Sequence, residues 1–419
     1  MNPPNDKRTG RRSPAVWLVL AAGVAALAGC ALIGSRPAPP PAAVVEAPPP
    51  PPVVKLADPV DTHKFTLEGD DDDVVGTVQI VASSKEDTLP DIARRFNVGY
   101  EEITRANPGV DPWLPGAGRD IVVPTRFVLP DAPRDGIVIN VAAMRLYYFP
   151  AHKKGEPQMV YTHPIGIGKA GWSTPQGVTS VVSHVKDPIW RPSAALRKDH
   201  FNDNGEQLPA VVKPGPDNPL GKFELTLGWP SYLIHGTNKP YGVGLRSSHG
   251  CVRLYPEDID KVFQMVPNGT HVRVVNQPFL FGLHDHELYL QAYGVLEDDA
   301  RDWNHAQKKL LTHALPPHIQ KALQDSGEQM DWQSIAVITH APRGLPIPLS
   351  GNGNSVDAVL AAAPKVENRI PEGADWDGID HTGTDAESAK QLLLERDPGT
   401  VQPAIPTTAQ APAPRAPGT

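Results

Sequence analysis

The chain contains little cysteine, few aromatic residues and no long basic segment. Only Cys30 and Cys251 occur among its 419 residues, and aromatic residues make up 6% of the sequence. The formal net charge is −8, and outside the first twelve residues no basic run is long enough to follow a phosphate backbone. The sequence therefore argues against a nucleic-acid partner. The length is too great for one small domain and predicts two or three.

The N-terminal thirty residues have the pattern of an export signal. A basic start is followed by an apolar run over residues 15–28, which is short for a membrane-spanning helix. The run ends in the letters LAGC, whose last residue is Cys30. These letters resemble the lipobox of bacterial lipoproteins, and the resemblance implies that Cys30 is lipidated and anchors the chain. Ala31 at the next position, in place of Asp, fits sorting to the outer membrane. A plain secretory signal and an uncleaved anchor remain open alternatives.

Much of the proline, 48 residues in all, lies near the two ends of the chain. Residues 31–75 are rich in Pro, Ala and Val, which predicts an extended polyproline spacer. Residues 349–419 are polar and rich in glycine and proline, and we expect them to be disordered because they bury too little apolar surface to fold. Residues 277–348 contain HELYLQAYGVLEDD and HAQKKLLTHALPPHIQKALQD, which predict short helices in a C-terminal extension packed on the preceding domain.

Residues 76–125 predict a small module with the order strand, helix, helix, strand. The letters TVQIVA and DIVVP are strand-like, and TLPDIARRFNV has apolar residues at helical spacing. Thr88, with Asp91 three residues later, predicts a capped helix N-terminus, and YEEITRANPG predicts a second helix that ends at Pro108 and Gly109. The pattern resembles a LysM module, which implies binding to the glycan of peptidoglycan. A small packing module without a ligand is the alternative.

Residues 136–276 are rich in predicted strands. The letters GIVINVAAMRLYYF predict two strands around a turn at Ala142 and Ala143. SYLIHGT places His235 at the end of an apolar strand, and a glycine-rich loop follows. PEDIDKVFQMV predicts a helix that begins at Pro256, because proline is tolerated in the first turn and acidic residues favour the positive end of the helix dipole.

The segment LRSSHGCVRLYPEDID concentrates the groups that carry chemistry. Cys251 lies two residues after His249, and His235 precedes both on the predicted strand. If Cys30 is lipidated, Cys251 has no disulfide partner, and an unpaired thiol in an oxidising envelope is a candidate reactive group. A nearby imidazole can lower the pKa of a thiol and hold a thiolate–imidazolium pair, and the backbone of Gly250 can approach a substrate closely. A packed structural cysteine and a zinc site made by the thiol and two histidines are the alternatives.

The letters HGTNKPYGVGLRSSHGCVRL, residues 235–254, resemble the active-site motif of the L,D-transpeptidase (YkuD) catalytic domain. STPQG and IVINVAAMRLYYF also occur in the order of that family. The resemblance covers about residues 136–276, and with the LysM-like module it is similar to the periplasmic enzymes that attach the Braun lipoprotein. The predicted strands indicate a mainly β fold. It comprises an antiparallel, β-sandwich-like catalytic domain with one flanking helix, the βααβ module and disordered termini.

The resemblance implies a role for each residue of the motif. Cys251 would attack the carbonyl that joins the third residue of a tetrapeptide stem to the terminal D-alanine, leaving a thioester from which an amine takes the acyl group. The implied base is His235. Four further residues are implied to orient that base or to shape the oxyanion pocket and its loop: Gly236, Ser248, His249 and Gly250. Two arginines are implied to bind the substrate, where a guanidinium suits a carboxylate: Arg253 and Arg246. No cofactor or metal is implied.

The implied partners are peptidoglycan, through its stem peptide and glycan, an outer-membrane lipoprotein as acceptor, and a membrane through the lipid anchor. The implied location is the periplasm of a Gram-negative bacterium. Three alternatives stay open. A second stem can be the acceptor. Water can be the acceptor, which gives a carboxypeptidase or an amidase. The protein can also be a non-catalytic scaffold that binds peptidoglycan.

Overall fold

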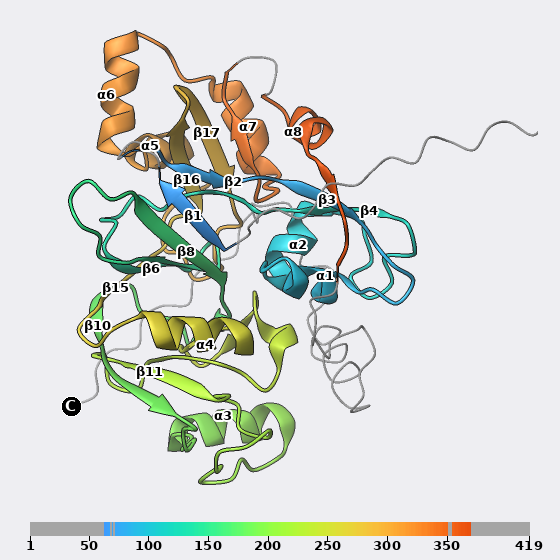
Figure 1. Cartoon of the computed structure of the whole chain (residues 1–419), viewed down its shortest axis with the longest axis vertical. Helices are drawn as coiled ribbons and strands as arrows, with labels where there is room; N and C mark the ends of the chain where they lie inside the picture. The colour runs from blue at the N-terminus through green and yellow to red at the C-terminus, as the bar shows by residue number, and fades with distance from the viewer. Residues whose placement is uncertain (1–62, 68, 70–71, 351–353, 370–419) are drawn as a thin grey trace, which may run out of the picture. The chain divides into compact units, whose positions relative to one another are not determined.

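A computed structural model describes residues 63–67, 69, 72–350 and 354–369 (Figure 1). The predicted export signal with Cys30, the predicted spacer up to residue 62, and residues 370–419 lie outside the described residues. The chain divides into two units, residues 1–54 and 55–419, and every described residue belongs to the second. Within the described ranges, no helix is both long enough and apolar enough to span a membrane.

The predicted βααβ module is present in the structure. Its elements are β3 (Gln79–Ala82), α1 (Leu89–Arg95), α2 (Tyr100–Ala106) and β4 (Asp120–Val123). The two strands pair antiparallel, and the apolar sides of the helices share a buried core with them (Figure 1). The predicted capping box is confirmed, because the Asp91 amide donates to Thr88 Oγ1 and the Thr88 amide donates to Asp91 Oδ2 at 2.8 Å. Local sequence signals therefore predict these four elements correctly.

The largest sheet has nine strands and carries the motif. In spatial order these are β1 (Lys64–Leu67), β8 (Gln158–Pro164), β7 (Arg145–Phe149), β6 (Gly136–Asn140), β15 (His271–Val275), β10 (Gly177–Lys186), β11 (Phe223–Leu227), β12 (Leu233–His235) and β14 (Val252–Arg253). Most neighbours are antiparallel, while β15 with β6 and β12 with β14 are parallel. The expectation of a mainly β fold, with two strands meeting at Ala142 and Ala143, is confirmed.

Helix α4 (Pro256–Met265) is the predicted flanking helix and packs on one face of this sheet. It begins at Pro256 and has acidic residues in its first turn, as its sequence predicts. A second helix, α3 (Ala194–Asn204), lies in the connection between β10 and β11 (Figure 1). Helix α3 could not be predicted from the sequence, since its apolar residues do not gather on one side.

The C-terminal extension contains a sheet as well as helices. Its elements are β16 (Phe279–His284), β17 (Glu287–Ala292), α5 (Gln307–His313), α6 (Pro317–Ser326), α7 (Trp332–His340) and β18 (Pro346–Pro348). The helix predicted from HELYLQAYGVLEDD is therefore wrong, because these residues form β17 in a hairpin with β16. Asp285 and His286 form the two-residue turn with φ of 50° and 64°, and a turn with both residues at positive φ matches the twist of a hairpin.

Two predicted boundaries need correction. The predicted spacer of residues 31–75 contains β1 and begins β2 (Val74–Gly76), which pairs with β5 (Arg126–Val128). The disorder predicted from residue 349 is wrong for residues 354–369. Helix α8 (Val356–Ala362) and strand β19 (Lys365–Val366) form there, and β19 pairs parallel with β3. Val366 is buried in the core of the βααβ module, and this burial stabilises a segment that is too polar to fold alone.

Arg145 on β7 reaches from the large sheet into the βααβ module. Its Nε and Nη2 atoms donate to the two carboxylate oxygens of Glu102 on α2, at 2.7 and 2.8 Å. Nη2 also donates to the carbonyl of Asn97 at 3.0 Å, and the guanidinium lies 4.1 Å above the centre of the Phe127 ring. The Arg145 side chain has no exposed surface and that of Glu102 is 4% exposed. The two parts of the chain are thus joined by a buried, bidentate ion pair.

The first turn of α2 supports the glycine-rich loop that follows β12. The Tyr100 amide donates to the carbonyl of Val243, and the Glu101 amide donates to the carbonyl of Gly244, both at 3.2 Å. Gly244 has a φ of 82°, and a Cβ there would lie 2.5 Å from the Cα of Gly99, so only glycine fits. The βααβ module therefore fixes part of the loop that leads to Cys251.

Candidate active site

Three adjacent strands bring the residues of the motif together. The side chains on one face of β11, β12 and β14 pack in the core with α4: Leu225, Leu227, Ile234 and Val252. Because side chains alternate along a strand, the opposite face carries Glu224, His235 and Arg253, which are neighbours in the strand register. Cys251 directly precedes β14, so the same alternation places it on this second face. The motif thus occupies a face that α4 does not cover.

Cys251 is half-buried at the start of β14. Its Sγ lies 3.6 Å from the carbonyl oxygen of Ser231, toward which the thiol donates. Burial raises the pKa of the Cys251 thiol, while a hydrogen bond from the Leu233 backbone and the charge of Arg253 act in the opposite direction. The thiol form is therefore favoured in the free protein.

His235 is buried at the end of β12 and held by its neighbour. Its Nδ1 lies 2.6 Å from the carbonyl oxygen of Gly236, the contact that the resemblance implies. Because a carbonyl only accepts, Nδ1 carries the hydrogen in this contact. The backbone of Leu220 also forms a hydrogen bond with the ring. Burial, followed by the nearby charge of Arg253, lowers the pKa of His235 to about 3. The imidazole is neutral at physiological pH.

These two shifts favour a neutral thiol and a neutral imidazole over a thiolate–imidazolium pair in the free protein. The ion pair that the motif suggests is disfavoured, because burial penalises both charged forms. A neutral pair can still react when the proton leaves the thiol as the sulfur attacks, provided that a base lies within reach.

We expect the alkylation of Cys251 by iodoacetamide to be slow at pH 7 and to accelerate about tenfold per pH unit without levelling off by about pH 9, because only the thiolate reacts and burial raises the pKa of this thiol. The rate can be followed by intact-mass spectrometry at several pH values, with the Cys251→Ala protein giving the background from Cys30. A rate that is already constant below pH 7 would instead indicate a thiolate–imidazolium pair.

His249 lies on the glycine-rich loop and is bound by the inserted helix α3. Its Nε2 lies 2.7 Å from Asp199 Oδ2, and its ring meets the edge of Trp172 at 4.8 Å between centres. Lys169 Nζ is 2.9 Å from the same carboxylate oxygen. Hydrogen bonds from Lys169 and then His249 lower the pKa of Asp199 to about 2, so this carboxylate stays charged. Asp199 positions His249, and its role could not be predicted from the sequence because it lies far from the motif in the chain.

The turn before Cys251 is held by two hydroxyl groups. Ser248 Oγ donates to the carbonyl of Cys251 at 2.6 Å and accepts from the Gly250 amide at 3.2 Å. Thr174 Oγ1 donates to the carbonyl of Gly250 at 3.0 Å. Gly250 has a φ of 102°, and a Cβ there would lie 2.7 Å from the ring of Tyr232, so the turn needs glycine. Hydrogen bonds from Ser248 and Thr174 therefore fix the backbone of this turn.

Arg253 lies beside His235 in the register of β12 and β14. Its Nη1 donates to Ser247 Oγ at 3.3 Å, while its Nε has no hydrogen-bond partner within the described ranges. Burial lowers the pKa of Arg253, although the guanidinium remains charged at neutral pH. A half-buried guanidinium is suited to bind a carboxylate group of a ligand.

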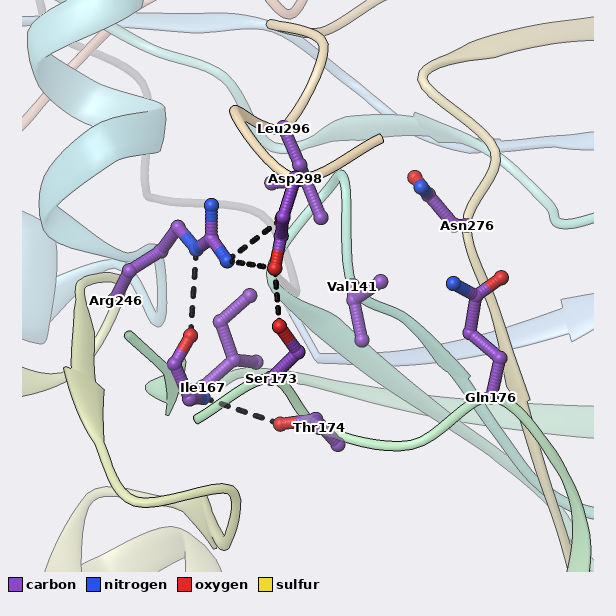
Figure 2. Close-up of a pocket in the computed structure, with 10 residues that line it drawn as sticks. Val141, Ile167, Ser173, Thr174, Gln176, Arg246, Asn276, Leu296 and Asp298 are labelled. Carbon is purple, nitrogen blue, oxygen red and sulfur yellow. Dashed lines mark hydrogen bonds and ion pairs between the residues drawn. The ribbon is translucent and has the colours of Figure 1, made fainter. Parts of the chain in front are cut away.

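Arg246 has a different environment from Arg253. It lies on β13 (Arg246–Ser248), which pairs with β9 (Ile167–Gly168), and its Nη2 donates to both carboxylate oxygens of Asp298 at 2.9 Å. Figure 2 shows Asp298 between Arg246 and Ser173, at a small cavity of about 90 Å³. Arg246 therefore ties the loop to the C-terminal extension, and the structure gives its side chain a partner other than a substrate.

The described residues include no group of three or more His, Cys, Asp or Glu side chains placed to hold a metal ion. His235 is directed to Gly236 and His249 to Asp199, so the histidines of the motif have separate partners.

Known proteins similar to this chain share its motif segment. The family profile described as the L,D-transpeptidase catalytic domain (YkuD) matches residues 134–274, and the LysM domain profile matches residues 84–124. The protein named "Probable L,D-transpeptidase ErfK/SrfK" of Salmonella typhimurium is 36% identical over 281 residues, which cover 66% of this chain and 88% of that protein. "Probable L,D-transpeptidase YbiS" of Escherichia coli is 43% identical over 51% of this chain and 69% of that protein.

Among solved structures, an L,D-transpeptidase from Mycobacterium smegmatis is matched with a TM-score of 0.26 and 19% identity, over 38% of this chain and 63% of that one. This chain belongs to the L,D-transpeptidase family and has a YkuD catalytic domain preceded by a LysM domain.

Proposed function

We propose that this L,D-transpeptidase is a cysteine acyltransferase that acts on the tetrapeptide stems of peptidoglycan through a thioester on Cys251. The observation that carries the proposal is the strand face on which Cys251 and the neutral His235 lie, with His235 Nδ1 held by Gly236. A nucleophile, a base and a partner that orients the base are the parts that acyl transfer by a cysteine needs.

In the proposed first step, His235 Nε2 accepts the thiol proton while Sγ of Cys251 bonds to the carbonyl carbon between the third residue and the terminal D-alanine. The C–N bond breaks, the amine of D-alanine takes the proton from His235, and a thioester remains. Arg253 binds a carboxylate of the stem. Ser248, Gly250 and His249 shape the turn around the developing oxyanion.

In the proposed second step, an amine takes the acyl group from the thioester. The acceptor is a lysine of an outer-membrane lipoprotein or the side-chain amine of a second stem. The LysM domain supports this assignment, because binding to glycan would hold the catalytic domain near its stem peptides. Lipidation of Cys30 would anchor the enzyme to the outer membrane in the periplasm of a Gram-negative bacterium.

The test is intact-mass spectrometry of the full chain mixed with a purified tetrapeptide stem. We expect a mass gain equal to the stem minus D-alanine, located on the peptide that contains Cys251, and an equimolar release of D-alanine. Release of D-alanine together with free tripeptide, unaffected by added amines, would indicate a carboxypeptidase. Binding to peptidoglycan with neither an adduct nor D-alanine would indicate a non-catalytic scaffold.

A further inference from the structure

We propose that Glu224 on β11 selects the acceptor amine and removes its proton before the thioester is attacked. This inference rests on the proposed function, and it assigns a residue to the second half of the reaction. The motif itself supplies a base for the first half through His235, while Glu224 lies outside the motif.

The geometry of the strands places Glu224 beside the reacting groups. Glu224 is the direct partner of His235 across β11 and β12, and directly opposed residues of an antiparallel pair have side chains on the same face. The neighbouring Leu225 is buried in the core on the other face. Glu224 therefore points to the face that carries Cys251 and Arg253.

Glu224 is half-buried and lacks a cationic partner. Thr226 Oγ1 donates to its Oε1 at 3.1 Å, and no ion pair to Glu224 is present within the described ranges. Burying a carboxylate without a cation costs free energy, so such a group is suited to a ligand that brings a positive charge.

The electrostatic environment of Glu224 is consistent with a role as a proton acceptor near Cys251. Burial raises the pKa of Glu224, which makes its carboxylate a better proton acceptor than an exposed one. The charge of Glu224 also contributes to the raised pKa of Cys251, as expected for two groups on one face.

The chemistry of the second step requires a group of this kind. An alkyl amine such as that of lysine titrates near pH 10.4 and is an ammonium ion at neutral pH, which has no lone pair to attack with. Glu224 would bind the ammonium and take one proton. The neutral nitrogen then bonds to the acyl carbon, the C–S bond breaks, and the departing sulfur receives the second proton through His235. The proton on Glu224 is released to water.

The opposite charges on this face also separate two substrates. Arg253 and Glu224 lie on the two sides of His235 in the register of three strands. Arg253 faces the carboxylate of the donor stem, and Glu224 faces the ammonium of the acceptor. A donor stem bound in the reverse orientation would place its carboxylate beside Glu224, and the acceptor ammonium would then lie beside Arg253. Both placements bring like charges together, so the site disfavours this orientation.

The test compares two acceptors on the full-length protein after acylation by a tetrapeptide stem. Nα-acetyl-lysine carries an ammonium at neutral pH and must lose a proton before it can attack. Methoxyamine is uncharged at that pH and can attack without losing a proton first. In Glu224→Gln we expect aminolysis by Nα-acetyl-lysine to fall about 100-fold, and that by methoxyamine to change less than about threefold. Glu224→Asp, which keeps the charge but shortens the reach, should lie between wild type and Glu224→Gln. Glu206→Gln, an exposed glutamate after α3, is the matched control for loss of one negative charge and should behave as wild type.

An equal fall for both acceptors in Glu224→Gln, or no fall for Nα-acetyl-lysine, would overturn the assignment of Glu224. The acyl adduct distinguishes this failure from failure of the proposed function. If wild type forms the adduct on Cys251 and only the acceptor preference is unchanged, Glu224 is wrong and the thioester stands. If wild type forms no adduct, the proposed function itself fails.

Discussion

A Cys251→Ala protein should release no detectable D-alanine from a tetrapeptide stem, a loss of about 10⁴-fold or more. The methyl group of alanine cannot form the thioester, and His235, with its lowered pKa, activates water poorly. The turn should survive the change, because Ser248 and Thr174 hold it through backbone atoms. D-alanine release can be measured by a coupled oxidase assay, with the mass of the protein recorded in parallel.

The second cysteine of the chain provides the matched control. Cys30→Ala removes the same kind of side chain and the predicted lipidation, and its turnover in detergent solution should equal that of wild type. Turnover retained by Cys251→Ala would show that another residue is the nucleophile. Loss of turnover in Cys30→Ala would show that Cys30 also takes part in the reaction, which contradicts its proposed role as a lipidated anchor.

Replacing Arg145 with methionine should lower the free energy of unfolding by about 3–5 kcal/mol, because it leaves the carboxylate of Glu102 buried without its cation. The change should also loosen the glycine-rich loop that leads to Cys251. Glu102 accepts the Gly99 amide at 2.7 Å, and the next two amides of α2 hold the loop at Val243 and Gly244. Urea unfolding followed by tryptophan fluorescence gives the free energy.

An exposed ion pair on α6 is the control for Arg145. Lys321 and Asp325 are 2.6 Å apart, but their side chains are 76% and 66% exposed. Lys321→Met should therefore change the free energy of unfolding by no more than about 0.5 kcal/mol. If Arg145→Met shifts the unfolding midpoint no further than Lys321→Met does, the buried ion pair does not stabilise the contact between the LysM domain and the catalytic domain.

Features encoded by a few consecutive residues could be predicted from the sequence. The Thr88 capping box, the hairpin around Ala142 and the helix start at Pro256 each depend on contacts within one turn of chain. The position of His235 at a strand end follows from the same kind of local pattern. These predictions needed no knowledge of which strands become neighbours.

Features that depend on distant partners could not be predicted in this way. The hairpin turn at Asp285 and His286 lacks glycine, and without that signal the sequence predicts a helix where β17 forms. Asp199 and Glu224 reach the site through an inserted helix and a neighbouring strand, and neither stands near the motif in the chain. A pattern in the sequence can name the nucleophile and its base, but the charges around them depend on strand register.

The pairing of β19 with β3 has a consequence for synthesis. The LysM domain leaves the ribosome early, yet its third strand follows the catalytic domain and the whole C-terminal extension. Until Val366 has emerged from the ribosome, β3 presents an open edge on one side, and such an edge is a template for pairing with other chains. The domain that appears first is thus completed last. A nascent chain needs protection at this edge for nearly the entire time of its synthesis, and truncation before residue 365 leaves the edge open permanently.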